Sequence, residues 1–95
     1  MNTKPGYEKL AGVLQRALDQ AQAGKGAERH AVQRTFSEQP MQRLCELYGP
    51  GFALGQAAKK AQESMRLPTV ERQVAELLGA INYLAGAVIH LERHL

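Results

Sequence analysis

The residues with the clearest potential for chemistry lie in one polar segment, residues 24–39, which reads GKGAERHAVQRTFSEQ. It carries four cationic or potentially cationic side chains, Lys25, Arg29, His30 and Arg34. Its glycines free the backbone to present N–H groups to an anion, and a helix that begins near Ser37 would add a partial positive charge. Arginine also offers a planar fork that matches phosphate.

This segment predicts a binding site for an anionic, nucleotide-like small molecule. Lys25, Arg29 and Arg34 would hold the anion, while His30 and Gln39 would give directional hydrogen bonds. Lys59 and Lys60 would add charge if their helix packs alongside. Two other interpretations remain open for the same residues. They could form a solvated loop whose charges serve solubility, or they could contact nucleic acid, although a net charge of +3 is mild for that role.

Other chemistry-bearing residues favour structural roles. His90 and His94 have a spacing that suits metal binding, but nothing nearby completes a site, so an exposed polar helix end is expected. Cys45 sits on an apolar helix face and is expected to be a small core residue. We therefore expect no catalytic residue, no metal and no cofactor.

The elements around these residues are predicted to be helices, because alanine, leucine, glutamine, glutamate and arginine dominate the composition. Glycine and proline divide the chain into four helical stretches with a long polar loop over 24–39. Ser37 would cap the second helix, with Pro40 in its first turn, and Thr69 would cap the fourth. The expected helices are Gly6–Ala23, Glu38–Tyr48, Phe52–Met65 and Thr69–Leu95.

The last helix is the most informative element. Its apolar residues recur at alternating spacings of three and four, which is typical of a helix–helix seam: Val74, Leu77, Ile81, Leu84, Val88 and Leu91. A second face is lined by the small or polar residues Ala75, Gly79, Asn82 and Gly86, which would let another helix approach closely. Contacts on two sides predict burial of this helix in an oligomer, a dimer or higher.

Two residues allow both a structural and a functional interpretation. Phe36 could stack on a base, but a hydrophobic staple against the following helix is favoured. Asn82 lies inside the most apolar stretch and must find a hydrogen-bond partner there. It could face a ligand, but fixing the register between helices is favoured, and the hydroxyl of Tyr83 has the same ambiguity.

Length and composition set the broader limits. Ninety-five residues indicate one domain over 1–95, and a core this small is marginal without an added source of stability. Disulfides cannot supply it, because Cys45 is the only cysteine. The absence of a signal peptide predicts a cytoplasmic protein. The longest uncharged stretch near the end, 77–89, is shorter than the roughly 18–20 residues that span a bilayer, so no membrane partner is expected.

Residues 76–85, reading ELLGAINYLA, carry a resemblance to a known family. They resemble the ELGD-x-x-x-Y-L-A type helix of the all-α MazG-like nucleotide pyrophosphohydrolases. The whole chain is also similar to short phage-encoded helical proteins, some loosely described as dATP/dGTP diphosphohydrolase-like. In those enzymes, acidic pairs bind Mg²⁺ ions that polarise the triphosphate. Here Ala80 stands where the metal-binding Asp would follow the Gly, and only Glu76 matches a family metal position.

Together these observations predict an all-α helical hairpin or small bundle that oligomerises through its last helix. The expected function is non-enzymatic binding or sequestration of an anionic nucleotide-like molecule. The resemblance implies a phage origin, hence the host cytoplasm and an anti-defence role. Two alternatives stay open: a divergent Mg²⁺-dependent nucleoside triphosphate pyrophosphohydrolase, and a protein- or nucleic-acid-interaction module that inhibits a host complex.

Overall fold

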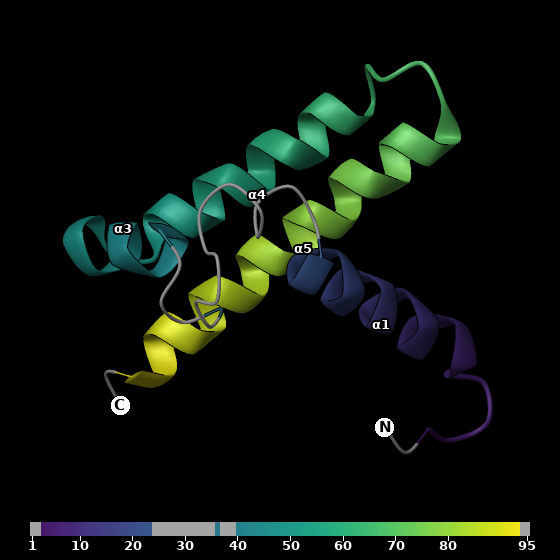
Figure 1. Ribbon diagram of the computed structural model, residues 1–95, viewed down its shortest axis with the longest axis horizontal. Coiled ribbons are helices and arrows are strands. Elements are labelled where there is room, and N and C mark those ends of the chain that lie inside the picture. The colour runs from purple at the N-terminus through teal and green to yellow at the C-terminus, as the bar shows by residue number, and fades with distance from the viewer. Residues whose placement is uncertain (1–2, 24–35, 37–39, 94–95) are drawn as a thin grey trace.

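A computed structural model of the chain describes residues 3–23, 36 and 40–93. These residues form helices and no strand, which confirms the all-α prediction. The helices, labelled as in Figure 1, are α1 (Glu8–Ala23), α3 (Pro40–Tyr48), α4 (Gly51–Ser64) and α5 (Val70–Arg93). Each lies within about two residues of its predicted bounds, the usual uncertainty of a helix end.

The bounds differ from prediction for local reasons. Gly6 was expected to begin the first helix, but its φ of 92° lies in the left-handed region, so α1 starts at Glu8. The Glu8 carboxylate accepts a hydrogen bond from the Gly6 N–H, 3.0 Å away. Thr69 caps α5 as predicted, because its hydroxyl oxygen accepts the Arg72 N–H at 3.2 Å. Gly49, with a φ of 82°, ends α3.

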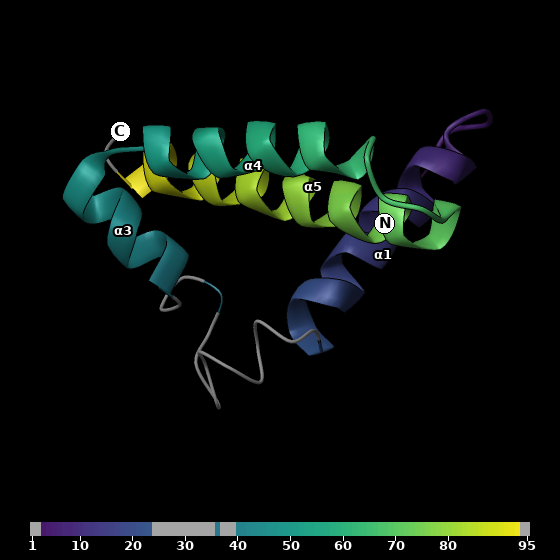
Figure 2. The ribbon, with the colours of Figure 1, turned by 90° about the horizontal axis from the view of Figure 1, so that it is seen from above.

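The fold has two layers. Helices α4 and α5 form an antiparallel hairpin joined by a short turn, and this pair makes the most extensive contact in the molecule. Seen from above in Figure 2, α1 and α3 both lie on the same side of that hairpin. Helix α5 contacts each of the other helices in the described ranges, α1, α3 and α4. It is therefore the central element of the fold.

The core is small and is built mainly from alanine. Cys45, Ala53 and Ala87 form its centre, where α3, α4 and α5 meet. The ring of Phe52 packs edge-on against that of Tyr83, with centroids 6.4 Å apart. Among the described residues, Leu78 is the only large aliphatic side chain in the buried core. Small side chains let the helices approach closely, but they remove little apolar surface from water.

Candidate functional site

Most of the predicted anion-binding residues, Lys25, Arg29, His30, Arg34 and Gln39, lie outside the described residues. The anion site therefore stays a prediction. Ser37 and His94 also fall outside the described ranges. Phe36 is half-buried, and the choice between staple and base stacking is not tested.

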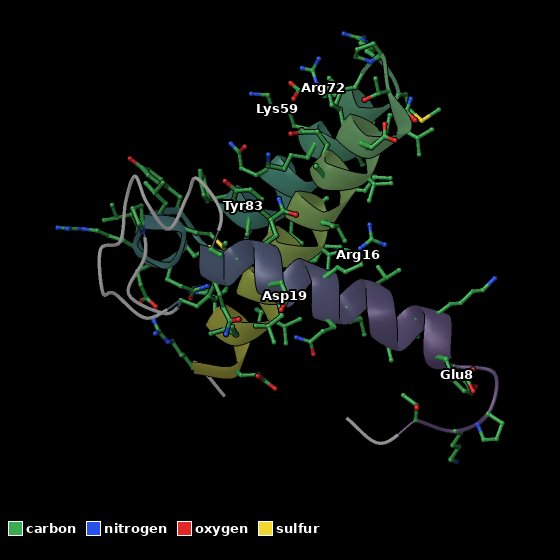
Figure 3. All side chains as sticks on the ribbon, turned by 45° about the vertical axis from the view of Figure 1, so that its right-hand side comes forward. Glu8, Arg16, Asp19, Lys59, Arg72 and Tyr83 are labelled. Atoms are coloured by element: carbon green, nitrogen blue, oxygen red, sulfur yellow. The ribbon has the colours of Figure 1, made fainter. Side chains whose placement is uncertain are left out.

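Lys59 and Lys60, the two remaining residues of that prediction, both face carboxylates. Lys60 Nζ lies 3.5 Å from Glu76 Oε1, and both side chains are less than a third exposed. Lys59 Nζ lies 4.0 Å from Glu63 one turn along α4. The side chains of Lys59 and Arg72 lie at the end of the hairpin farthest from the C-terminus (Figure 3). Any anion bound at Lys60 would have to compete with Glu76.

The small-residue face of α5 is occupied by the other helices of the same chain. The Asn82 amide donates to the Ala17 carbonyl of α1 at 3.0 Å. Gly79 lies against the Lys60 side chain of α4, where an added Cβ would come within 3.2 Å of Lys60 Cδ. The structural interpretation of Asn82 is therefore supported: it fixes α1 on α5. The close approach predicted for this face takes place within one chain.

Among the described glycines, Gly86 has the least room for a side chain, and it lies where α3 packs against α5. A Cβ at this position would overlap the Met41 sulfur. The same proximity lets the Gln42 amide donate to the Gly86 carbonyl at 2.9 Å. Gln42 is 1% exposed, and its Oε1 has no hydrogen-bond partner. Cys45, one turn further along α3, is fully buried, which confirms its predicted core role.

The prediction of an exposed polar helix end is wrong for His90. Its side chain is buried, and Nδ1 lies 3.4 Å from Glu46 Oε1 of α3. Arg93 Nη1 lies 3.7 Å from the same oxygen, so one carboxylate joins the ends of α3 and α5. Sequence reasoning missed this cluster. The available signal was that His90 follows Gly86 by four residues and so continues the small-residue face.

Glu76, the one residue that matches a metal position of the MazG-like enzymes, is not part of an acidic cluster in the described residues. Glu76 is engaged by Lys60, Glu71 is exposed at the start of α5, and Ala80 is buried. Within residues 3–23, 36 and 40–93, no group of three or more His, Cys, Asp or Glu side chains could hold a metal ion.

The opposite side of α5, the predicted seam, is largely uncovered. Residues two apart in a helix point in nearly opposite directions, about 200° apart, so Leu77 and Leu84 point away from the faces held by Gly79 and Gly86. Val74 and Ile81 of the seam are half-buried. The other four seam residues are exposed, with exposed fractions of 44% for Leu77, 49% for Leu84, 54% for Val88 and 55% for Leu91.

Helix α4 extends this uncovered surface. The row that faces α5 holds the buried residues Ala53, Ala57 and Ser64 and the half-buried Lys60. Phe52 lies to one side of that row, toward Cys45 of α3. The opposite flank holds Leu54, Ala58, Ala61 and Met65, all exposed. This flank and the α5 seam both lie on the side of the hairpin away from α3, and we call them together the hairpin face.

A second apolar stripe lies on α1. Tyr7, Leu10, Leu14 and Leu18 recur at spacings of three and four along the helix, but all are exposed. Ala17 is instead the buried residue of α1, because α1 docks on α5 through its small side chain and backbone. The spacing shows that α1 is amphipathic, but it does not show which side of the helix faces the core.

No family model matches the chain, and no curated protein and no solved structure matches it. The resemblance to MazG-like enzymes is thus neither supported nor opposed by comparison. By length and composition α5 could cross a membrane, although the core helix of a soluble protein passes the same test. Only 28% of its most apolar window is buried inside the chain.

Proposed function

We propose that the protein is a protein–protein interaction module that docks the hairpin face onto a partner. The observation that supports this most directly is the uncovered α5 seam. Leu77, Leu84 and Leu91 recur every seven residues on the central helix, yet each is about half exposed. Exposed apolar side chains gathered in one patch are typical of interaction sites, whereas scattered ones need no explanation.

The free energy available at this surface is substantial. The exposed parts of the four seam side chains and of Leu54, which is 48% exposed, amount to about two and a half complete side chains. Burying a complete apolar side chain contributes about 1.5–3 kcal/mol, so covering the face gains about 4–8 kcal/mol from this chain alone. Association itself costs about 4–15 kcal/mol. A stable complex therefore requires a partner that contributes a comparable apolar surface.

The polar contacts of α5 support docking by the intact hairpin rather than by a detached helix. Asn82, Gly79 and Gly86 hold α1, α4 and α3 against the other side of α5. Removing α5 from this arrangement to insert it elsewhere would break all three contacts. The seam can be covered without disturbing any of them. This is the arrangement expected of a preformed docking surface.

Site-specific photo-crosslinking inside cells that express the protein tests this proposal. A photoreactive residue at position 84 should form a covalent adduct with a protein, whether a second copy or another chain. The matched control is position 47, because Leu47 is 67% exposed but lies on α3, across that helix from the buried Gln42 and Cys45. Absence of a protein adduct at 84, or equal yields at 84 and 47, would contradict the proposal.

A further inference from the structure

The hairpin face has a shape and sequence pattern that fit one partner in particular. We propose that its partner is a second copy of this chain, packed with the two α5 helices antiparallel about a two-fold axis. The axis passes the midpoint of the seam, between Asn82 and Tyr83. This inference rests on the proposed function and names the partner of the same surface.

A second copy supplies the comparable apolar surface that association requires. Leu77, Leu84, Val88 and Leu91 of α5 and Leu54 of α4 are each about half exposed. Because a two-fold contact uses the same patch on both partners, each copy covers on the other the same apolar side chains that it leaves exposed itself.

The order of residues along the seam is symmetric about its midpoint. Val74 and Leu91 are equally far from the point between Asn82 and Tyr83, as are Leu77 and Val88, and Ile81 and Leu84. A two-fold contact places the same patch on both partners, so that residue i meets j and j meets i. An antiparallel copy therefore sets every seam residue opposite another apolar residue, with no unmatched position.

Charge near the seam favours the antiparallel direction over the parallel one. Glu92 flanks Val88 on α5, and a parallel copy would set it near the partner's Glu92. An antiparallel copy sets it opposite Gln73 instead. Antiparallel helices also bring opposite ends of their dipoles together. Arg93 takes no part in this contact, because it lies 3.7 Å from Glu46 on the α3 side of α5.

The α4 flank completes the contact. Leu54, Ala58, Ala61 and Met65 border the seam, so two hairpin faces would stack as a four-helix layer. Ala58 and Ala61 are small and allow the partner's α5 to approach α4 closely. In this arrangement α1 and α3 of each copy remain on the outer sides (Figure 2). Their contacts with α5 are unchanged.

Sedimentation equilibrium on the full-length chain tests whether the partner is a second copy. The wild type should be a dimer, and Leu84→Glu should raise the dimer dissociation constant at least about 100-fold, since it places a charge at the desolvated centre. Leu47→Glu should leave it unchanged. Circular dichroism should show the same helicity in both variants, because neither residue is buried. If Leu84→Glu loses helicity, Val88→Glu serves in its place, because Val88 is 54% exposed.

The distance between two spin labels tests whether the two α5 helices of the dimer run antiparallel or parallel. Cys45 is fully buried, so Glu92→Cys provides a selectively labelled site. Position 92 would lie opposite Gln73 of an antiparallel copy, which separates the two labels by nineteen residues, about 30 Å at 1.5 Å per residue. A parallel dimer would bring them within about 15 Å, since helices pack 8–10 Å apart. The short distance would overturn the proposed arrangement.

The outcomes separate this inference from the proposed function. A wild type that stays monomeric at about 100 μM, far above the dissociation constant of a specific dimer, overturns the second copy. If position 84 still forms a crosslink to another protein, the interaction module stands with a different partner. If monomeric protein binds lipid vesicles and Leu84→Glu abolishes that binding, the face serves a membrane surface and both proposals fail. Equal effects of Leu84→Glu and Leu47→Glu also overturn the dimer.

Discussion

The tight contact between α3 and α5 gives a quantitative prediction at Gly86. An alanine in the middle of a helix is favoured over glycine by about 1 kcal/mol. At Gly86, however, the added Cβ would overlap the Met41 sulfur and crowd the Gln42 amide, 3.2 Å away. Overpacking of this kind costs about 1–3 kcal/mol. We therefore expect Gly86→Ala to lower the free energy of unfolding by about 1 kcal/mol net.

Gly55 is the matched control, because it lies in α4 with nothing within 4 Å of its added Cβ. Gly55→Ala benefits from the preference of alanine over glycine in a helix, and its added Cβ overlaps no other atom. It should therefore raise the free energy of unfolding by up to about 1 kcal/mol. Gly79→Ala should fall between them, since its added Cβ meets only the flexible Lys60 side chain at 3.2 Å. The predicted order of stability is Gly55→Ala, then Gly79→Ala, then Gly86→Ala.

Urea unfolding at one protein concentration measures this order, with the slope m checked for constancy. The single concentration matters because an oligomer's stability depends on it. Met41→Ala offers a second check: in that background the penalty of Gly86→Ala should shrink, which a double-mutant cycle reports as coupling. A Gly86→Ala protein as stable as Gly55→Ala would refute the close packing of α3 on α5.

Three further perturbations test separate parts of the account. Asn82→Ala should cost about 1 kcal/mol, because it removes the hydrogen bond to Ala17 that holds α1 on α5, and thermal unfolding measures it. Gln42→Met should lower the free energy of unfolding by no more than about 1.5 kcal/mol, because it also removes a buried unpartnered oxygen. In the same assay Gln42→Glu should destabilise the protein strongly, because it buries a charge. Similar losses of stability in the two variants would contradict the burial of Gln42. A nucleotide panel should raise the melting temperature if the predicted anion site exists, and Arg29→Ala with Arg34→Ala should abolish that shift.

The sequence predicted the helices well because their ends depend on local chemistry. Thr69 caps α5, and Gly49 with Pro50 ends α3, as glycine and proline at these positions require. Gly6 was expected to begin the first helix, two residues too early. Pro5-Gly6 is instead the pattern of a type II turn, which needs a glycine with positive φ, and the Tyr7 N–H donates to the Lys4 carbonyl at 3.2 Å across this turn. The signal that places Gly6 before the helix was therefore present in the neighbouring sequence.

The sequence also revealed that α5 has two different faces, but not which partner each face meets. Gly79, Asn82 and Gly86 were expected to admit another helix, and they meet α4, α1 and α3 of the same chain. The periodicity of a helix shows that a face can be buried. It does not show whether the burial takes place inside the chain or between chains.

Tertiary contacts determined what the pattern could not. The apolar stripe of α1 is exposed because Ala17 and the α1 backbone, rather than the leucines, contact α5. His90 looked like part of a polar helix end until α3 packed over it and brought Glu46 to 3.4 Å. In both cases the deciding partner lies far away in the sequence.

The central claim is that the hairpin face is covered when the protein associates. Methyl NMR with a soluble paramagnetic probe measures this directly, because the probe relaxes only methyl groups that solvent reaches. In the assembled protein, we predict strong protection for Leu84 and Val88, although both are about half exposed in the single chain, and strong relaxation for Leu47. Relaxation of Leu84 and Val88 as strong as that of Leu47 would contradict the claim.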